Sequence, residues 1–114
     1  SLEVPLTCAR AVLYKRADMA PLARPSAEVC ALAKRDLKPG DRLDAIGEYT
    51  YRAWAMAATE ARTANAVPCG LLERATVTGP VRKGELLTYA NTAVLKDSRI
   101  VELRRRQDAL VYGA

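Results

Sequence analysis

The sequence predicts a mainly β fold: a small module of short strands, preceded by a helical arm and interrupted by one helical insertion. Short apolar or alternating runs are separated by Pro-Gly and Gly-Pro dipeptides, which mark tight turns between strands. One turn signature occurs twice, as expected of a repeated β unit. The core must be thin, because the 114 residues include no Phe and one Trp. A chain of this length holds one core rather than two.

The first element is an amphipathic helix over residues 5–17. Pro5 suits a first helical position, and apolar residues recur at helical spacing at Leu6, Ala9, Val12 and Leu13. Pro21 and Pro25 then fix their own φ angles and bias the residues before them toward extended backbone. We therefore expect residues 1–26 to form a helical arm and linker, and residues 27–114 to form the module with a basic C-terminal tail.

The module begins with a strand over residues 27–33. Pro39-Gly40 follows and predicts a tight turn into a short second strand. Residues 48–54 alternate in strand fashion, so they are the next strand of the sheet. The first half of the module is therefore expected to be a small sheet with tight connections.

The second half starts with an alanine-rich stretch over residues 56–65, which favours a helix that ends at Pro68. This helix is the insertion on the sheet. Residues 71–78 predict another strand, and Gly79-Pro80 predicts a turn. The tail that follows has apolar residues whose spacing fits a strand or a helix: Ile100, Leu103, Leu110 and Val111.

Residues 37–43 and 81–87 share one pattern: apolar, basic, any residue, Gly, acidic, any residue, and Leu. Each Gly is placed where a tight turn needs a positive φ, and the flanking apolar residues point back into a shared core. Two half-motifs of one shape predict a pseudo-symmetric β unit. The aligned pairs are Leu37 with Val81, Lys38 with Arg82, Gly40 with Gly84, Asp41 with Glu85, and Leu43 with Leu87.

Charge and hydropathy argue against nucleic acid and membrane partners. The net charge is +5, but 18 basic residues are interspersed with 13 acidic ones, without an aromatic-flanked basic stripe. No stretch approaches the roughly 20 apolar residues of a membrane span, and the N-terminus lacks an export signal, so we expect a cytoplasmic location. The absence of an initiator Met suggests a chain trimmed at its start. Three widely spaced cysteines are expected to be reduced core thiols.

Catalytic machinery is not evident in the sequence. His is absent, which removes the usual general base and the commonest metal ligand together. The acidic residues mostly occupy turn positions, where they are ordinary solvated turn formers. Neither a Gly-x-Gly-x-x-Gly string nor a P-loop occurs, so we expect no cofactor site, no metal site and no catalytic residue in this chain.

One polar and aromatic stretch, residues 47–54, has the chemistry to bind a polyol or a sugar acid. Aromatic faces stack on sugar C–H groups, and Arg and Glu bind hydroxyls. Arg62, on the expected helix, is a natural partner for a carboxylate. The alternative is that the aromatic side chains fill the Phe-free core and that Arg62 is solvated. The candidate ligand-binding residues are Glu48, Tyr49, Tyr51, Arg52 and Arg62.

The segment over residues 33–43 and its echo over residues 81–88 resemble the SAF domain. That family also includes the antifreeze-like domains of sialic acid synthases, flagellar and pilus assembly proteins, and sugar-acid dehydratases. The resemblance covers roughly residues 27–95 and implies a β-clip fold of short strands.

The flanking segments, residues 2–14 and 103–110, are similar to the C-terminal part of homoserine-dehydrogenase-like NAD(P)-dependent oxidoreductases that end in a SAF domain. The resemblance implies a Rossmann domain and a catalytic domain before this chain, with NAD(P) bound there. It implies an accessory role: shaping a polyol or sugar-acid site, or holding the subunits of a homo-oligomer together. Whether such a parent acts on homoserine stays open.

Two other functions are compatible with a SAF domain. One is a non-enzymatic assembly or chaperone module of the flagellar or pilus type, which usually acts outside the cytoplasm and so fits poorly with the missing export signal. The other is the small domain of a sugar-acid dehydratase, which is disfavoured by the absence of His.

Overall fold

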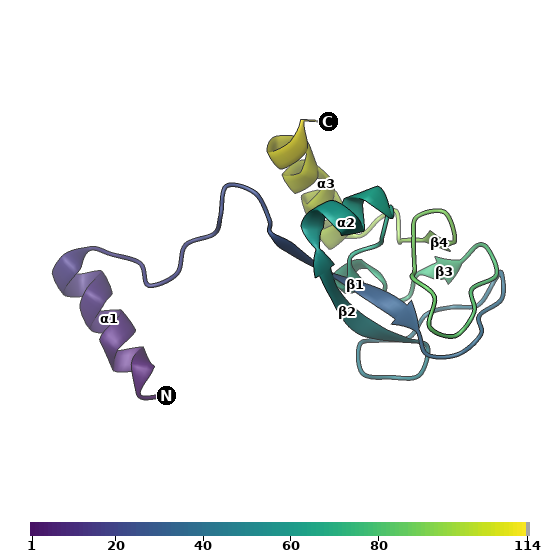
Figure 1. Cartoon of the computed structure of the whole chain (residues 1–114), viewed down its shortest axis with the longest axis horizontal. Coiled ribbons are helices and arrows are strands. Elements are labelled where there is room, and N and C mark those ends of the chain that lie inside the picture. Colours follow the sequence, from purple (N-terminus) through teal and green to yellow (C-terminus); the bar gives the residue numbers. More distant parts are fainter. Residues whose placement is uncertain (114) are drawn as a thin grey trace.

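An N-terminal arm stands apart from the rest of the chain in the computed structural model, which describes residues 1–113 (Figure 1). Its helix, α1 (Glu3–Tyr14), contributes no buried residue and is followed by the C-cap residue Lys15, whose backbone is left-handed with φ 53°. In the linker, the Asp18 carboxylate accepts hydrogen bonds from the Arg10 guanidinium at 2.7 Å and the Thr7 hydroxyl at 2.6 Å. These bonds hold the pKa of Asp18 below its ordinary value and tie the start of the linker to α1.

The body starts with two antiparallel strands of seven residues, β1 (Ala27–Ala33) and β2 (Tyr51–Ala57), which pair along their whole length. The short helix α2 (Ala58–Thr63) follows β2 directly. Ala61 of α2 shares a small buried cluster with Cys30 of β1, so this helix covers one side of the strand pair.

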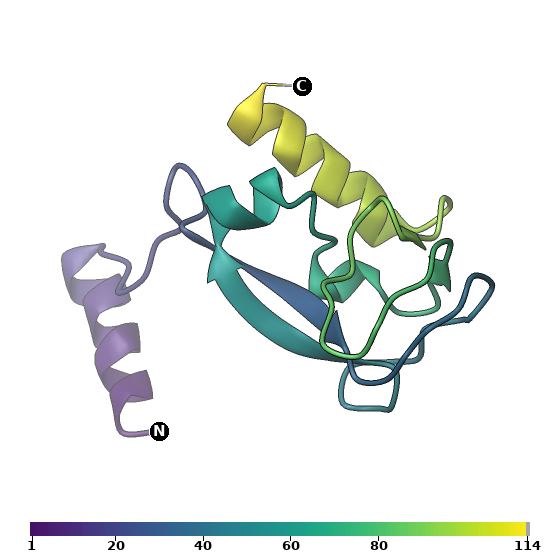
Figure 2. The same ribbon diagram turned by 45° about the vertical axis from the view of Figure 1, so that its right-hand side comes forward.

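The rest of the body is built from three short elements and one long helix. A single 3-10 turn, η1 (Cys69–Leu71), leads to β3 (Thr76–Val77), which pairs with β4 (Thr92–Ala93). The chain then forms α3 (Arg99–Tyr112), which lies beside α2 (Figure 2) and buries Val101 in the core. None of the helices between residues 1 and 113 has the length and apolar character needed to cross a membrane.

The core is thin and almost entirely aliphatic, as its composition predicts. Tyr51 is the one aromatic side chain in the main cluster of the described residues. Val, Leu and Ala side chains make up most of the rest. The fully or nearly fully buried members are Ala31, Ala33, Leu37, Leu43, Tyr51, Val67, Cys69, Leu71, Leu72, Ala75, Val77, Val81, Leu87 and Val101.

The two glycine turns have the same geometry, as the repeated motif predicts. Gly40 and Gly84 have φ angles of 93° and 86°. In both turns the N–H of the acidic residue after the glycine donates to the carbonyl three positions earlier, at 3.0 Å. The carboxylates of Asp41 and Glu85 accept a return bond from the N–H of that earlier residue, at 3.0 and 2.8 Å. Each half-motif is therefore a closed turn with its own acidic cap.

The prediction of a mainly β, β-clip fold is wrong, because the chain is an α/β protein with 31% helix and 21% strand. Its sheets are two separate strand pairs. The C-terminal tail contributes most to this difference from the expected fold, since it forms the 14-residue helix α3 and no strand. The half-motifs contribute isolated bridges rather than long strands, because their residues are used in tight turns. A strand is expected over residues 71–78, but within this range only Thr76 and Val77 form one, as β3, and Leu71 belongs to η1.

The expected helices form, with shifted ends. The arm helix begins at Glu3 and ends at Tyr14 instead of spanning residues 5–17. The helical insertion is shorter than the alanine run, because Met56 and Ala57 pair with β1 before α2 begins. Pairing with a neighbouring strand therefore overrides the helix propensity of these residues.

Candidate functional site

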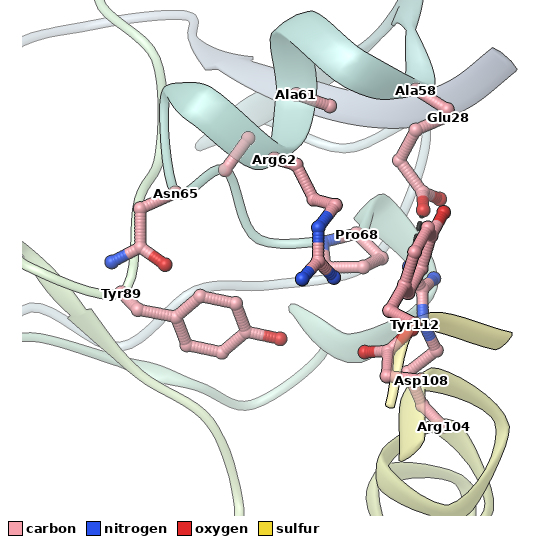
Figure 3. A pocket seen from close by; sticks show the side chains of 11 residues that line it. Glu28, Ala58, Ala61, Arg62, Asn65, Pro68, Tyr89, Arg104, Asp108 and Tyr112 are labelled. Atoms are coloured by element: carbon pink, nitrogen blue, oxygen red, sulfur yellow. Dashed lines mark hydrogen bonds and ion pairs between the residues drawn. The ribbon is translucent and has the colours of Figure 1, made fainter. Parts of the chain in front are cut away.

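A polar pocket opens between α2 and α3 (Figure 3). Its cavity measures about 240 Å³. The walls come from segments far apart in the sequence: the start of β1, α2 and the turn after it, the loop before β4, and one face of α3. The lining residues are Glu28, Ala58, Ala61, Arg62, Asn65, Ala66, Pro68, Tyr89, Arg104, Asp108 and Tyr112.

An ion cluster centred on Arg104 fixes one side of the pocket. Its guanidinium pairs with the Glu28 carboxylate of β1 and, at 2.8 Å, with the Asp108 carboxylate one helical turn along α3. The Arg104 and Glu28 side chains are 20% and 18% exposed. Hydrogen bonding to Glu28 raises the pKa of Arg104, against an opposing effect of burial, and Asp108 adds to the rise. Arg104 is therefore permanently charged and already neutralised by its two partners.

Arg62 presents a second guanidinium to the pocket. Its central carbon lies 3.9 Å from the centre of the Tyr112 ring, a cation–π contact that holds the side chain against α3. Within residues 1–113, Arg62 makes no ion pair. It is thus oriented by an aromatic ring while its hydrogen-bond donors stay available to a ligand.

Tyr89 and Asn65 supply the neutral polar groups. The Asn65 carbonyl accepts the Tyr89 N–H at 3.0 Å, which anchors the loop before β4 at the end of α2. Asn65 has a left-handed backbone, with φ 53°, a conformation that Asn tolerates better than most residues. Burial raises the pKa of Tyr89, so its hydroxyl stays protonated at neutral pH. In Figure 3 the Tyr89 ring extends into the pocket from the wall opposite α3, and the Asn65 amide lies on that same wall.

The arrangement suits the binding of a polar ligand. The pocket contains donors and acceptors, but no side chain that would serve as a nucleophile beside a base. Burial raises the pKa of the Cys30 and Cys69 thiols, which disfavours their reactive thiolate form. Among the described residues, no group of three or more Cys, Asp and Glu side chains could hold a metal ion.

The five candidate ligand-binding residues do not come together. Arg62 lines the pocket, and the other four do not. Tyr51 is fully buried in the core. Its hydroxyl has no hydrogen-bond partner within residues 1–113, and burial raises its pKa to about 12.

The remaining three candidates lie on or before β2. Glu48 and Tyr49 belong to the exposed loop that precedes this strand, where their backbone groups close the turn. Arg52 lies on β2 and places its guanidinium 5.2 Å from the centre of the Trp54 ring. These positions form no cavity around a ligand with Arg62.

Sequence reasoning missed most of the pocket because it depends on α3. Arg104, Asp108 and Tyr112 are spaced four residues apart, so they would share one face in a helix or in a strand, but only a helix brings neighbours in this series within about 6 Å of one another. Because the sequence leaves open whether the tail is a strand or a helix, this spacing does not predict that the three side chains lie close together. Glu28 is 76 residues away from its partner Arg104, and no local pattern links the two.

A search of known protein families finds none that matches this chain, and no curated protein matches it either.

Proposed function

We propose that this chain is a non-catalytic accessory module that binds a small hydroxylated carboxylate, such as a sugar acid, between α2 and α3. The observation that supports this most directly is Arg62, a guanidinium held by Tyr112 at the mouth of a polar cavity without a carboxylate partner in residues 1–113. A guanidinium in this situation forms strong, bidentate hydrogen bonds with a carboxylate.

The charge of the pocket favours a monoanion. Glu28 and Asp108 both bind Arg104, so the cluster they form is closed, and Arg62, which is exposed to solvent, is the guanidinium of the pocket that is free to pair with an anion. A phosphate dianion would bring a second negative charge close to the carboxylates of Glu28 and Asp108. A carboxylate ligand has one negative charge, which the Arg62 guanidinium neutralises. Tyr89 and Asn65 are then placed to bind hydroxyl groups.

The size of the cavity also fits a small ligand. Its volume of about 240 Å³ corresponds to about eight water molecules at roughly 30 Å³ each. That space suits a molecule of about six carbon atoms and is too small for a dinucleotide. The ligand would therefore be a substrate, product or effector of another domain, and not a nicotinamide cofactor.

We further propose that the module belongs to a larger cytoplasmic NAD(P)-dependent oxidoreductase of the homoserine-dehydrogenase-like type, in which the cofactor is bound by preceding Rossmann and catalytic domains. The support for this part is the SAF-like sequence motif, present in two copies and folded into two equivalent turns at Gly40 and Gly84. In such a protein, the module would help to shape or sense a polyol or sugar-acid site.

Calorimetry and amide-shift titration with gluconate test the pocket, with the uncharged polyol sorbitol as the matched control ligand. We expect gluconate to shift amide signals of α2 and α3, and sorbitol to bind much more weakly. Arg62→Gln should weaken gluconate binding about tenfold or more, since it removes a charged hydrogen-bonding partner.

Arg52→Gln is the matched control variant, because it removes the same charge from a position outside the pocket. It should leave gluconate binding unchanged. Equal losses in the two variants would show that binding responds to net charge alone, and the absence of any shift at gluconate concentrations of tens of millimolar would reject the pocket.

A further inference from the structure

The arm helix carries an apolar stripe that nothing in its own chain covers. Leu2, Leu6, Ala9 and Leu13 recur at intervals of four, three and four residues, which places them on one face. Leu2, Leu6 and Leu13 are 92%, 51% and 71% exposed. A 12-residue helix is marginal in water without tertiary packing, so this stripe needs a partner surface.

The body carries a matching surface on the flank of α3 next to the polar pocket, and the two cavities share Glu28, Pro68 and Arg104. Ile100, Leu103, Gln107 and Leu110 recur at intervals of three, four and three residues. The first three of them form one wall of an apolar groove of about 420 Å³. The start of β1 and η1 form the rest of it, with Val29 and Leu71. Ile100 and Leu103 are 54% and 48% exposed, so the groove is open.

The two stripes fit each other in pattern, length and charge. Alternating intervals of three and four residues are those of helices that pack side by side with interlocking side chains. The helices are ~18 Å and ~21 Å long at 1.5 Å per residue. No charged residue belongs to either stripe. The charged residues beside the groove, Glu28 and Arg104, neutralise each other.

We propose that α1 of one copy of this chain lies in the α3–η1–β1 groove of a second copy, and that the exchange is reciprocal. The inference goes beyond ligand binding, because it assigns a subunit-joining role to the arm and does not involve Arg62. One helix in one groove is small beside a standard interface of about 800 Å² per partner, and the reciprocal arrangement doubles the contact.

The position of α1 favours a second copy over the same chain, because α1 stands apart from its own body, and the linker allows it to reach a neighbouring one. It enters β1 at Ala27, which itself lines the groove, so the tether starts at the edge of the binding surface. Asp18 ties the start of the linker to α1, and Pro21 and Pro25 stiffen the remainder. Residues 15–26 reach up to about 40 Å when extended. Figures 1 and 2 both show α1 projecting away from its own body.

The native Cys8 thiol on α1 allows a direct test with the full chain. Cys8 is exposed, whereas Cys30 and Cys69 are buried, so a nitroxide reagent labels the arm selectively. Spin-labelled protein is mixed with isotope-enriched, unlabelled protein in which Cys8→Ser removes the thiol. We expect the enriched copy to lose signal intensity at groove amides, including those of Ile100 and Leu103. A second sample carries the spin label and the isotope on the same chain. Broadening seen only in that sample would mean that α1 occupies the groove of its own chain and would overturn the proposal. The absence of broadening in both samples would also overturn it.

Variants test the same contact by mass in solution. Leu6→Asp together with Leu13→Asp charges the stripe and should convert a dimer into a monomer in sedimentation and light scattering. Leu103→Asp should do the same from the groove side. Ala11→Asp is the matched control, because Ala11 lies on the opposite face of α1 and its variant should remain dimeric. A wild-type chain that is monomeric at millimolar concentration, or an Ala11→Asp variant that dissociates equally, would contradict the exchange.

Discussion

Leu37 and Val81 exchange both of their backbone hydrogen bonds, with N···O distances of 2.8 and 3.0 Å, across 44 positions of sequence. They occupy equivalent places in the two half-motifs, so the body is organised around this pair. On either side of it the chain enters a tight turn at Gly40 or Gly84. The β unit is therefore pseudo-symmetric in its hydrogen bonds as well as in its sequence.

Replacing Gly40 or Gly84 with Val should lower the free energy of unfolding by about 1–3 kcal/mol, because a β-carbon is disfavoured at positive φ. A Cβ at either position would meet no atom within 4 Å, so the cost comes from the backbone and not from a clash. Urea unfolding measures the loss. Gly70→Val is the control, since Gly70 has open space around it without a positive φ. Unchanged stability in both turn variants would mean that the repeated glycines have no conformational role.

Asp44 should stabilise the loop before β2 through its ionised form. Its carboxylate accepts the N–H groups of Tyr49 and Thr50 at 2.8 and 3.1 Å, and also the Thr50 hydroxyl. Burial acts to raise the pKa of Asp44, but the bonds from Thr50 and Tyr49 outweigh it and the net shift is downward. Asp44→Ala should therefore cost about 1.5–3 kcal/mol at pH 7.

The pH dependence gives the sharper check on Asp44. A lowered folded pKa means that the stabilisation is complete above the ordinary value of 3.8 and is lost as the pH falls through the folded pKa. The stability gap between wild type and Asp44→Ala should hold from pH 7 to about pH 4 and narrow below it. Asp97→Ala removes an exposed carboxylate and should stay within about 0.5 kcal/mol of wild type throughout. A gap that is independent of pH would point to packing instead of charge.

Removing residues 1–24 should leave a folded body with nearly unchanged melting. The reason is that α1 places no residue in the core, whose members all lie between Cys30 and Val101. The shortened chain should also be a monomer, because it has lost the arm. Calorimetry and light scattering on the two chains decide both points. A shortened chain that fails to fold would show that the arm is an integral part of the body.

The chain alone should bind neither NAD nor NADP. It lacks a glycine-rich nucleotide motif, and its polar pocket is too small for a dinucleotide. Titration calorimetry with each cofactor, alongside gluconate as a positive comparison, measures this directly. Micromolar binding of either nucleotide would contradict an accessory role with the redox chemistry placed in other domains.

Local signals were enough to predict the parts of the fold that depend on neighbouring residues. Pro39 and Gly40 specify a turn by their own φ preferences, so the turn is present where the sequence places it. Tyr51 shows where this reasoning stops. Alternation along β2 was visible in the sequence, but which side of the strand faces the core is decided by pairing with Ala33, which points the ring inward.

The candidate site is harder to predict, because contacts between segments far apart in the sequence place most of its residues. Arg62 was found because an arginine beside a loop is a recognisable ligand group. Tyr89 was missed because only the bond from its N–H to the Asn65 carbonyl places it in the pocket. The ion cluster needs the tail to be helical, and a helix of 14 residues is stabilised by its contacts with the body more than by its own propensity.

The link between Glu28 and Arg104 also sets the order of events during synthesis. Glu28 leaves the ribosome with its partner still 76 codons away, which is about 4–15 s at 5–20 residues per second. Until then β1 has a carboxylate without its counter-ion, and the wall of the pocket that α3 provides does not exist. Because α3 provides one wall of the pocket, ligand binding can begin only after α3 has emerged and docked.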